Sequence, residues 1–498
     1  MYRFRSRALS RSSAVSYKLF DREPHFYKNV FTLALPIALQ SLITIAVNMM
    51  DNVMVGNLNE ESLSAASLAN SFISIYQIFC MGLGMGASVL ISRYYGMKSS
   101  DASHPVEANI KNIMPDSPED IKNDAAMALK QTVALMLRLT LLLASVFAIL
   151  TACIPGWIMK TYTDEKNIIE LGMTYFRWSV ITYFFQGASL TSTIALRSVR
   201  QVKLPLLVSI GAFFVNILSN YTFIFGHFGA PRMEIAGAAL GTLIARFFEF
   251  TLILGYLFLY DREINFRIKD LFMNTRSLLG EYIRICIPVL ISDGILAFGN
   301  NTVSMVIGHL GKTFVAANSI TGDTQRLSTV VVQGVSQAGA IVTSQTLGTG
   351  KKEQTIKQGY LFFGLGLGLG LVSAFFITLF KEPIISCYGK VSLETHDIAV
   401  RLMLAISLII IFQATNSIMT KGVLRGGGDT KILMLTDNVF LWVISIPLGL
   451  LAGFVFHLSP FWIYVCLKSD QIIKTFWSYL RLKSGKWIRK ISTGLKEE

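Results

Sequence analysis

Long apolar blocks, separated by short polar stretches, dominate the chain. Residues 31–50 (FTLALPIALQSLITIAVNMM) and 361–380 (LFFGLGLGLGLVSAFFITLF) contain no charged side chain. A helix rises about 1.5 Å per residue, so a block of this length crosses the ~30 Å hydrocarbon layer of a bilayer. The pattern predicts an all-α membrane protein of twelve transmembrane helices, and Lys468, Asp470 and Lys474 interrupt the last of them. The expected spans are 29–56, 63–92, 128–152, 168–196, 204–226, 234–260, 281–308, 314–344, 357–380, 396–420, 431–454 and 459–480.

Basic residues gather at the chain ends and in alternate loops. If the N-terminus is cytoplasmic, the inside segments hold most of the Lys and Arg, whereas the outside loops 57–62 and 457–460 hold none. This bias predicts an even number of spans with both termini in the cytoplasm. Residues 1–28 and 483–498 are then basic cytoplasmic tails.

The two halves of the chain repeat. Pro36, Gly82, Ser92 and Gly96 recur as Pro288, Gly334, Ser344 and Gly348 at an offset of 252, and ALRSVRQVK (195–203) recurs as VLRGGGDTK (423–431) at an offset of 228. The repeat predicts two six-helix lobes, 29–262 and 263–482, related by a pseudo-twofold axis along the membrane normal, with the substrate path between them. The offset falls because the first lobe carries a polar insertion, 99–124, which we expect to be a mobile cytoplasmic loop.

Composition supports the membrane assignment and excludes several other classes. Apolar residues make up 52% of the chain and charged residues 15%, against roughly a quarter in soluble proteins. The net charge of +14 is spread over loops and tails, which fits topology and not nucleic-acid binding. The five cysteines are scattered and include no CxxC pair, so we read them as packing residues.

Motifs for catalysis or nucleotide binding are missing from the sequence. GTGKKE (348–353) lacks the first glycine and the final Ser/Thr of a phosphate loop, and the glycines at 364–370 lie inside an apolar helix. The chain has no HExxH or GxSxG motif. We therefore expect a protein that is not an enzyme, that has no cofactor, and whose uphill transport uses a gradient of Na⁺ or H⁺.

Two acidic residues stand out because they lie inside predicted spans. Asp51 is near the outer end of the first span, and Asp293 lies five residues after Pro288 in the seventh. A carboxylate deep in a bilayer costs about 2.5–3.5 kcal/mol, so it needs a partner, a water-filled cavity or a proton. Such a group suits the binding of H⁺, Na⁺ or a cationic substrate; the alternative is a structural carboxylate bonded to neighbouring helices.

Other polar residues within the predicted spans can likewise be functional or structural. Asn216 and Asn220 are i,i+4 neighbours that are able to bind a cation or to join two helices. Arg246 and Glu249 are spaced for a structural ion pair, and the same holds for Asp323 with Arg326. Asp437 is a weaker candidate for function, and Gln77, Gln333 and Gln413 fit interhelical hydrogen bonds.

At these positions the sequence resembles the multidrug and toxic compound extrusion (MATE) family. The resemblance covers nearly all of residues 29–482. It rests on the order, spacing and duplication of four motifs: LALPIALQSLITIAVNMMDNVMVGNL (33–58), GLGMGASVLISRYYG (82–96), GVSQAGAIVTSQTLGTG (334–350) and GVLRGGGDTK (422–431).

The resemblance implies two lobes in a V that alternate between inward-open and outward-open states while an entering cation drives out an organic, often cationic, substrate. It places the family's N-lobe cation site on Asp51 and Asn216, with Asn220 where some branches have an acid, and it aligns Thr242 loosely with a threonine of that site. It assigns Asp293 to charge compensation of the substrate or a second ion. It further implies a monomer in the bacterial cell membrane, with small organic molecules and the bilayer as partners and no nucleic acid.

Two other readings remain open at this stage. A lipid-linked oligosaccharide flippase belongs to the same wider superfamily, but such proteins have more spans or a basic central cavity. A membrane enzyme or a ligand-gated receptor is a different class, and the missing catalytic motifs and the internal repeat count against it.

Overall fold

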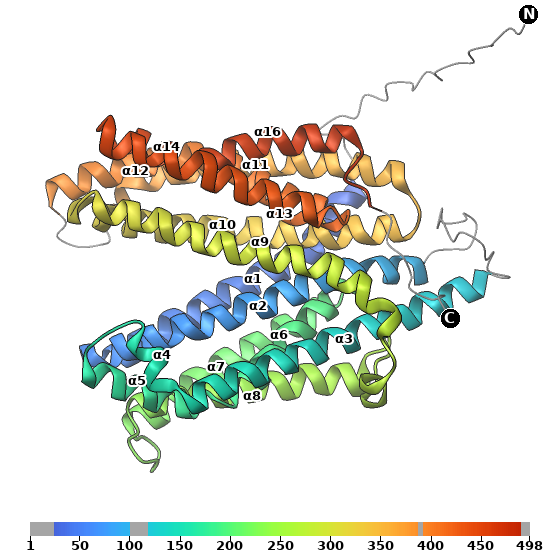
Figure 1. Cartoon of the computed structure of the whole chain (residues 1–498), viewed down its shortest axis with the longest axis horizontal. Helices are drawn as coiled ribbons and strands as arrows, with labels where there is room; N and C mark the ends of the chain where they lie inside the picture. Colours follow the sequence, from blue (N-terminus) through green and yellow to red (C-terminus); the bar gives the residue numbers. More distant parts are fainter. Residues whose placement is uncertain (1–23, 100–117, 387–391, 490–498) are drawn as a thin grey trace, which may run out of the picture.

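The chain folds into helices that lie nearly parallel to one another (Figure 1). Figure 1 shows the computed structural model, which describes residues 24–99, 118–386 and 392–489. Within these ranges no residue is in a β-strand. The long helices are α1 (Pro24–Gly56), α2 (Glu60–Lys98), α3 (Pro118–Cys153), α5 (Lys166–Ser179), α6 (Thr182–Ser198), α7 (Lys203–Phe225), α8 (Ile235–Gly255), α9 (Arg276–His309), α10 (Lys312–Gly348), α11 (Lys352–Ser386), α12 (Leu393–Ser417), α13 (Thr430–Val439) and α16 (Ser469–Ser484).

Short helical pieces extend or connect these helices. They are α4 (Pro155–Lys160), α14 (Ile446–Leu450), α15 (Pro460–Leu467), the 3₁₀ turn η2 (Ile268–Phe272) and the π-helical turns η1 (Tyr256–Tyr260), η3 (Ile418–Leu424), η4 (Phe440–Ser445) and η5 (Leu451–Val455). With these pieces joined, the twelve predicted spans are confirmed, and the chain is a multi-pass membrane protein.

Three of the twelve spans would be missed on length and hydropathy alone. Among the described residues, nine helices are long and apolar enough to cross a membrane. The other three spans are α10, which is too polar, and the broken pairs α5–α6 and α15–α16. The second break has a clear cause, because the backbone N–H of Asp470 donates to Ser445 Oγ at 2.7 Å and not to the preceding turn.

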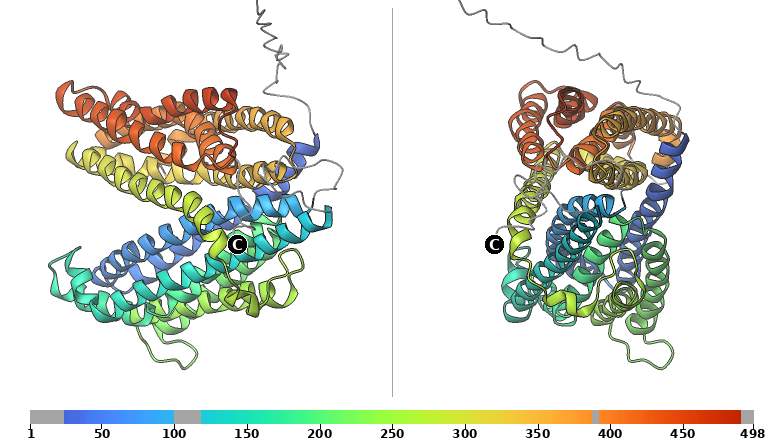
Figure 2. Two further views of the ribbon diagram at one scale, coloured as in Figure 1. Left: turned by 45° about the vertical axis from the view of Figure 1, so that its right-hand side comes forward. Right: turned by 90° about the vertical axis from the view of Figure 1, so that its right-hand side faces the viewer.

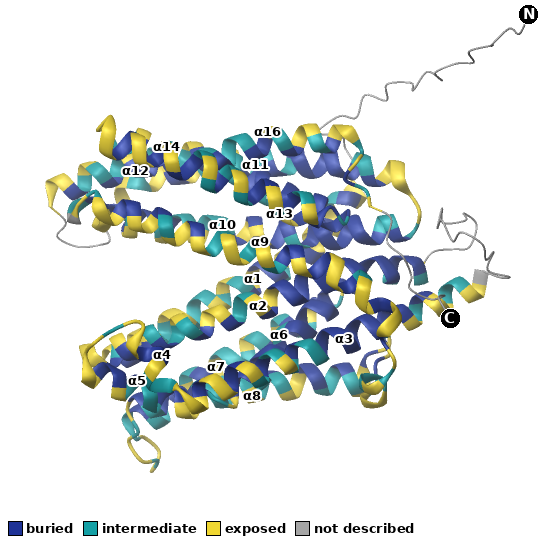
Figure 3. Cartoon of the chain, viewed as in Figure 1, coloured by how far each residue is buried: buried dark blue, intermediate teal, exposed yellow. Residues whose placement is uncertain are grey.

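The helices form two lobes arranged as a V (Figures 1 and 2). We call α1–α8 the N-lobe and α9–α16 the C-lobe. The ribbons meet at the end that holds the first turn of α1 and the last turn of α16, which we call the closed end, and they diverge towards the open end. Buried residues run across both lobes at the closed end, while exposed ones are frequent at the tips of the open end (Figure 3).

Helices α1 and α9 exchange partners between the lobes. At the closed end, Phe26, Val30 and Ile37 of α1 are buried in a core made mostly of C-lobe residues from α10, α11 and η3. Reciprocally, Tyr282 and Cys286 of α9 are buried among α2, α3 and α6. Each lobe has a second, separate core at the open end. The exchange links the lobes at one end and leaves them separate at the other.

The pseudo-twofold axis passes between Gly96 and Gly348, where α2 crosses α10. A side chain on Gly96 would clash with the carbonyl of Gln345, and one on Gly348 would clash with the carbonyl of Arg93. The two contacts interchange under the offset of 252 that the sequence repeat gives. Only glycine permits so close a backbone approach, so the repeat is a physical symmetry of the lobe interface.

Parts of the predicted insertion and C-terminal tail are ordered structure. Residues 118–124 form the first turns of α3, while 100–117 lie outside the described residues, as do 1–23 and 490–498. Residues 485–489 pack on the loop before α13, where Trp487 is fully buried against Gly427. The Arg489 carbonyl accepts a hydrogen bond from Arg93 Nη1 at 2.8 Å, so this segment joins the two lobes.

Candidate functional site

Asp51 and two asparagines meet inside the N-lobe. Asn220 Nδ2 on α7 donates to Asp51 Oδ1 on α1 at 2.6 Å and lies 3.5 Å from Asn216 Oδ1. Both asparagines are almost fully buried, at 1% and 0% exposure. The side-chain oxygen of Asn220, Oδ1, is buried and has no hydrogen-bond partner among the described residues. The sequence-predicted residues Asp51, Asn216 and Asn220 are therefore brought together in one cluster.

The position of Asn220 depends on a glycine of α8. Gly237 and Gly241 form a GxxxG pair that lets α8 approach α7 closely. A Cβ on Gly241 would clash with Asn220 Oδ1. Gly241 therefore makes the space in which the amide turns towards Asp51.

Further polar groups surround the cluster on the adjoining helices. The hydroxyl of Tyr175 on α5 donates to Asn70 Oδ1 on α2 at 3.2 Å and also interacts with Thr242 and Asp51. Thr242 therefore reaches the cluster through Tyr175. Arg246 Nη1 forms the predicted ion pair with Glu249 Oε2 at 2.8 Å, and Arg246 also acts on Asp51 electrostatically.

The cluster offers oxygen atoms and one carboxylate. Among the described residues, no group of three or more His, Cys, Asp or Glu side chains could hold a metal ion. A single carboxylate with amide and hydroxyl oxygens suits a proton or a monovalent hard cation better than a transition metal. The repeat-related position in the C-lobe is Val303, which is buried in an apolar core, so Asp51 has no carboxylate counterpart at that position.

Asp293 lies apart from that cluster and already has a partner. Arg425 Nη2, at the end of η3, donates to Asp293 Oδ1 at 3.3 Å. The Arg425 side chain is 6% exposed and that of Asp293 is 23% exposed. Arg425 belongs to the repeated motif VLRGGGDTK (423–431), which is rich in polar and glycine residues, yet its side chain is buried and reaches into the lobe. Any cation that binds Asp293 has to share it with this guanidinium.

The N-lobe counterpart of Arg425 is Arg197, at the same offset of 228. Arg197 donates to Gln337 Oε1 at 2.7 Å and to Gln40 Oε1. Gln40 is on α1 and Gln337 is on α10, so Arg197 bridges the lobes. The two arginines thus reach the two exchanged helices, Arg197 reaching α1 and Arg425 reaching α9.

A third charged cluster lies inside the C-lobe. Lys474 Nζ is 3.1 Å from Asp470 Oδ2 and 3.3 Å from Asp437 Oδ1, and the three side chains are 2–6% exposed. Asp470 also accepts from Gln471 Nε2 at 2.7 Å, and Gln471 accepts from Asn416 Nδ2 at 2.8 Å. The network explains how the last span tolerates charges that interrupt its apolar pattern.

Comparison with known proteins decides the family. A family model described as MatE matches residues 36–106, 125–222 and 288–451, which is well over half of the chain. The chain belongs to the MATE family. MATE proteins are membrane transporters, so this MATE chain is a transporter and not an enzyme.

Curated relatives match over most of their length. The probable multidrug resistance protein NorM of Thermotoga maritima is 24% identical over 475 residues, which cover 94% of this MATE chain and 95% of the relative. The multidrug resistance protein PmpM of Pseudomonas aeruginosa is 24% identical over 443 residues, covering 86% and 84%.

Solved MATE structures share the fold. A mutant of the Vibrio cholerae MATE transporter VcmN aligns with a TM-score of 0.80 at 15% identity, covering 95% of this chain and 99% of that one. The outward-facing conformation of a multidrug resistance MATE family transporter aligns with a TM-score of 0.79 at 17% identity, covering 93% and 97%.

Several site residues of this MATE protein were missed by sequence reasoning. Tyr175 and Asn70 are ordinary span residues in the sequence, and only the packing of α5 against α2 brings them beside Asp51. Gly241 had a readable signal, because GxxxG in an apolar segment indicates close helix packing. Lys474 was read as an interruption of a span, although a lysine four residues after Asp470 is itself a signal for an ion pair.

Proposed function

We propose that this MATE transporter is a cation-coupled antiporter that exports organic, often cationic, drugs or toxic compounds by alternating access. The names of its curated relatives support multidrug export. The observation that carries cation coupling is the contact between Asp51 and the Asn220 amide nitrogen, with the amide oxygen of Asn220 buried and unpartnered among the described residues. A bound Na⁺ supplies the positive charge, or a bound H⁺ supplies the hydrogen-bond donor, that the oxygens of Asp51 and Asn220 lack.

The coupling follows from where the cluster lies. Asp51 is in the part of α1 that packs within the N-lobe, whereas the first turns of α1 pack in the C-lobe. An ion bound at Asp51 therefore acts on a helix that belongs to both lobes. It shifts the balance between the two states of the V only as far as it binds one state more tightly.

Asp293 has the second role in this proposal. Its pairing with Arg425 leaves the carboxylate partly exposed, and a cationic drug that reaches it can replace the guanidinium as its partner. Charge compensation by exchange of partners avoids an unpaired carboxylate in either state.

The proposed orientation places the closed end in the cytoplasm, in keeping with the basic residues at that end. Both termini are then cytoplasmic, in the cell membrane of a bacterium, and the structure corresponds to an outward-open state. We further propose a monomer, because both lobes and the interface between them come from one chain.

Ethidium efflux from reconstituted vesicles tests the coupling. The Na⁺ and pH gradients are varied separately in wild type and in Asp51→Asn, with Glu60→Gln as a control at an exposed acid. Gradient-driven efflux is expected in wild type and in the control and is lost in Asp51→Asn. Wild-type gradient dependence in Asp51→Asn would rule out the proposed coupling site.

A further inference from the structure

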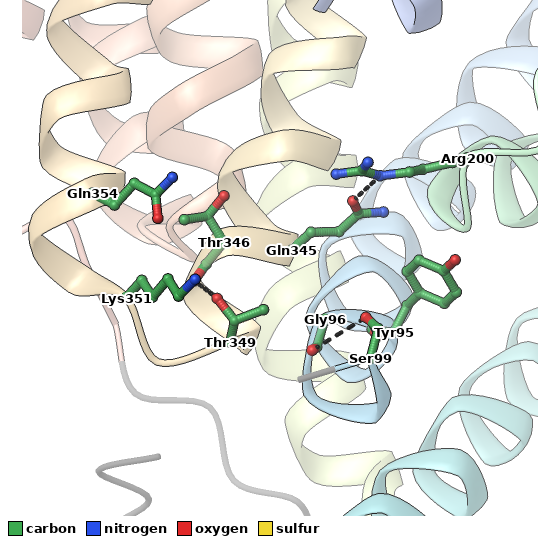
Figure 4. A pocket seen from close by; sticks show the side chains of 9 residues that line it. All are labelled: Tyr95, Gly96, Ser99, Arg200, Gln345, Thr346, Thr349, Lys351 and Gln354. Carbon is green, nitrogen blue, oxygen red and sulfur yellow. Dashed lines mark hydrogen bonds between the residues drawn. The ribbon is translucent and has the colours of Figure 1, made fainter. Parts of the chain in front are cut away.

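A cavity of about 310 Å³ lies at the closed end, between the two lobes (Figure 4). Its walls come from the end of α2, the loop before α7, the end of α10 and the start of α11. Tyr95, Ser99 and Arg200 belong to the N-lobe, and Gln345, Thr349 and Lys351 belong to the C-lobe. The volume falls in the range of small-molecule sites.

The charge of the walls is positive. Arg200 and Lys351 line the cavity, and no Asp or Glu lies among the described lining residues. Arg200 uses Nε to donate to Gln345 Oε1 at 2.6 Å, across the lobe interface. In the described part of the chain, no hydrogen bond or ion pair occupies its two terminal amino groups. A guanidinium with a free edge is suited to a phosphate or carboxylate oxygen pair.

Two acids lie near Tyr95, although neither is among the residues that line the cavity. Glu263 hydrogen-bonds the hydroxyl of Tyr95, and Asp261 acts on that hydroxyl electrostatically. The oxygens of Asp261 also accept hydrogen bonds from Gln201 and from the backbone N–H groups of residues 263–265. Neither acid forms an ion pair with Arg200 in the described part of the chain, so the guanidinium edge stays available to a ligand.

A second cavity of about 200 Å³ adjoins the first and shares Arg200, Thr346 and Gln354 with it. Gln358 lines this second cavity and is only 8% exposed. Its Oε1 is buried and has no hydrogen-bond partner among the described residues. A buried amide is normally satisfied by protein, water or ligand, so this group points to an occupant. A phosphate monoester, which has acceptor oxygens and can carry an O–H, satisfies both the amide and the cations.

We propose that these joined cavities form a binding site for a phosphate-type anion at the closed end. The phosphate belongs either to a soluble molecule or to the headgroup of an anionic lipid. Because the walls come from both lobes, the anion binds the state in which the closed end is shut more tightly than the state in which it is open. By linkage, the anion stabilises that state and slows the transport cycle. Binding itself does not depend on the proposed cation coupling at Asp51.

Binding is measured on the full purified chain in phosphate-free buffer. One arm titrates inorganic phosphate against chloride at matched ionic strength and follows the melting temperature. The other arm uses nanodiscs of phosphatidylcholine with or without phosphatidic acid. The variants are Arg200→Gln and Lys351→Gln, with Lys352→Gln as the matched control, since Lys352 is the next residue and does not line either cavity.

If the site exists, the melting temperature of wild type is expected to rise in a saturable manner in at least one arm. Each charge removal weakens binding about tenfold, while Lys352→Gln binds as wild type does. A response to inorganic phosphate identifies a soluble anion, and a response to phosphatidic acid alone identifies a lipid headgroup. If neither arm stabilises wild type beyond chloride, or if Lys351→Gln responds as Lys352→Gln does, the site does not exist. Lys351 is exposed, so this comparison holds even where Arg200→Gln folds poorly.

Discussion

Arg425 donates a hydrogen bond to Asp293 at 3.3 Å, although 132 positions separate the two residues in the chain. The pair connects the end of η3 to the exchanged helix α9. Each of the two side chains is largely removed from water, and each is stabilised in its charged form by the opposite charge of the other. This relationship decides what single substitutions at either position do.

We predict that either half of the pair, removed alone, destabilises the protein. Asp293→Asn leaves the 6% exposed side chain of Arg425 without a countercharge, and Arg425→Gln leaves Asp293 unpaired. Loss of one partner of a fully buried pair costs about 3–5 kcal/mol, and the partial exposure of Asp293 reduces this to roughly 1–3 kcal/mol. The double variant Asp293→Asn, Arg425→Gln is expected to recover most of the loss. Thermal unfolding in detergent checks this, and additive losses in the double variant would contradict it.

A second prediction concerns Gly241, which touches Asn220 but carries no side chain of its own. Gly241→Ala pushes the Asn220 amide away from Asp51, because the new methyl group takes the place of Oδ1. Overpacking of this kind costs about 1–3 kcal/mol. We expect gradient-driven efflux to fall at least about tenfold while the protein still inserts and folds.

The matched control is Gly255→Ala, on the same helix, where a Cβ meets no atom within 4 Å. It is expected to transport as wild type does. Equal activity of the two variants in reconstituted vesicles would show that the placement of Asn220 is not needed for coupling.

The number of spans and the repeat could be predicted from the sequence because both depend only on the order of residues along the chain. Apolar blocks of membrane length and glycines at a constant offset need no tertiary information. The breaks in the fourth and twelfth spans were not predictable in this way. The break after Lys468 depends on Ser445 taking the N–H of Asp470, a contact between residues 25 positions apart.

The residues of the candidate site were likewise predictable only in part. Asp51, Asn216 and Asn220 were predicted because an acid and two amides inside apolar spans are conspicuous. The partner of Asp293 was not, since Arg425 stands in a polar loop motif that looks solvent-exposed. Its side chain reaches Asp293 only because η3 and α9 pack together. Which charged residues pair inside the protein depends on tertiary contacts. The sequence alone therefore shows which residues are charged but not which of them form ion pairs.

The C-lobe cluster gives a third prediction, on stability. Lys474→Met leaves Asp437 and Asp470 facing each other without a countercharge inside the lobe. We expect a loss of about 3–5 kcal/mol, seen as a lower melting temperature and a lower yield of inserted protein. Lys483→Met, on an exposed turn of the same helix, is the control and is expected to be neutral. An unchanged melting temperature for Lys474→Met would mean that this ion network does not hold α16 in place.

A fourth prediction concerns topology. Glu60 is exposed at the open end, where it begins α2 within the segment 57–62 that the charge bias places outside the cell. In a background free of native cysteines, Glu60→Cys is expected to react with a membrane-impermeant maleimide on intact cells. Lys352→Cys, at the closed end, is expected to react only after the membrane is permeabilised. The reverse pattern would invert the proposed orientation.

The last prediction separates the two acids. They are not equivalent under the repeat, since Val303 takes the place of Asp51 in the C-lobe and Ser41 takes that of Asp293 in the N-lobe. Their surroundings differ too: Asp51 bonds to a neutral amide and feels Arg246 only electrostatically, whereas Asp293 pairs directly with a guanidinium. Asp51→Asn therefore removes the carboxylate that Asn220 contacts among the described residues and is expected to abolish gradient-driven efflux while drug binding persists.

Asp293→Asn acts on the drug and not on the driving ion. It is expected to weaken binding of a cationic drug about tenfold or more and of a neutral drug much less, because only the cation loses a charge partner. Binding of a cationic and a neutral drug to both variants, together with efflux under separate Na⁺ and pH gradients, distinguishes the roles. Arg425→Lys keeps the positive charge beside Asp293 and serves as the control for damage to the pair itself. If both acid variants keep wild-type coupling ratios and drug affinities, the two carboxylates are structural groups held by their helix neighbours.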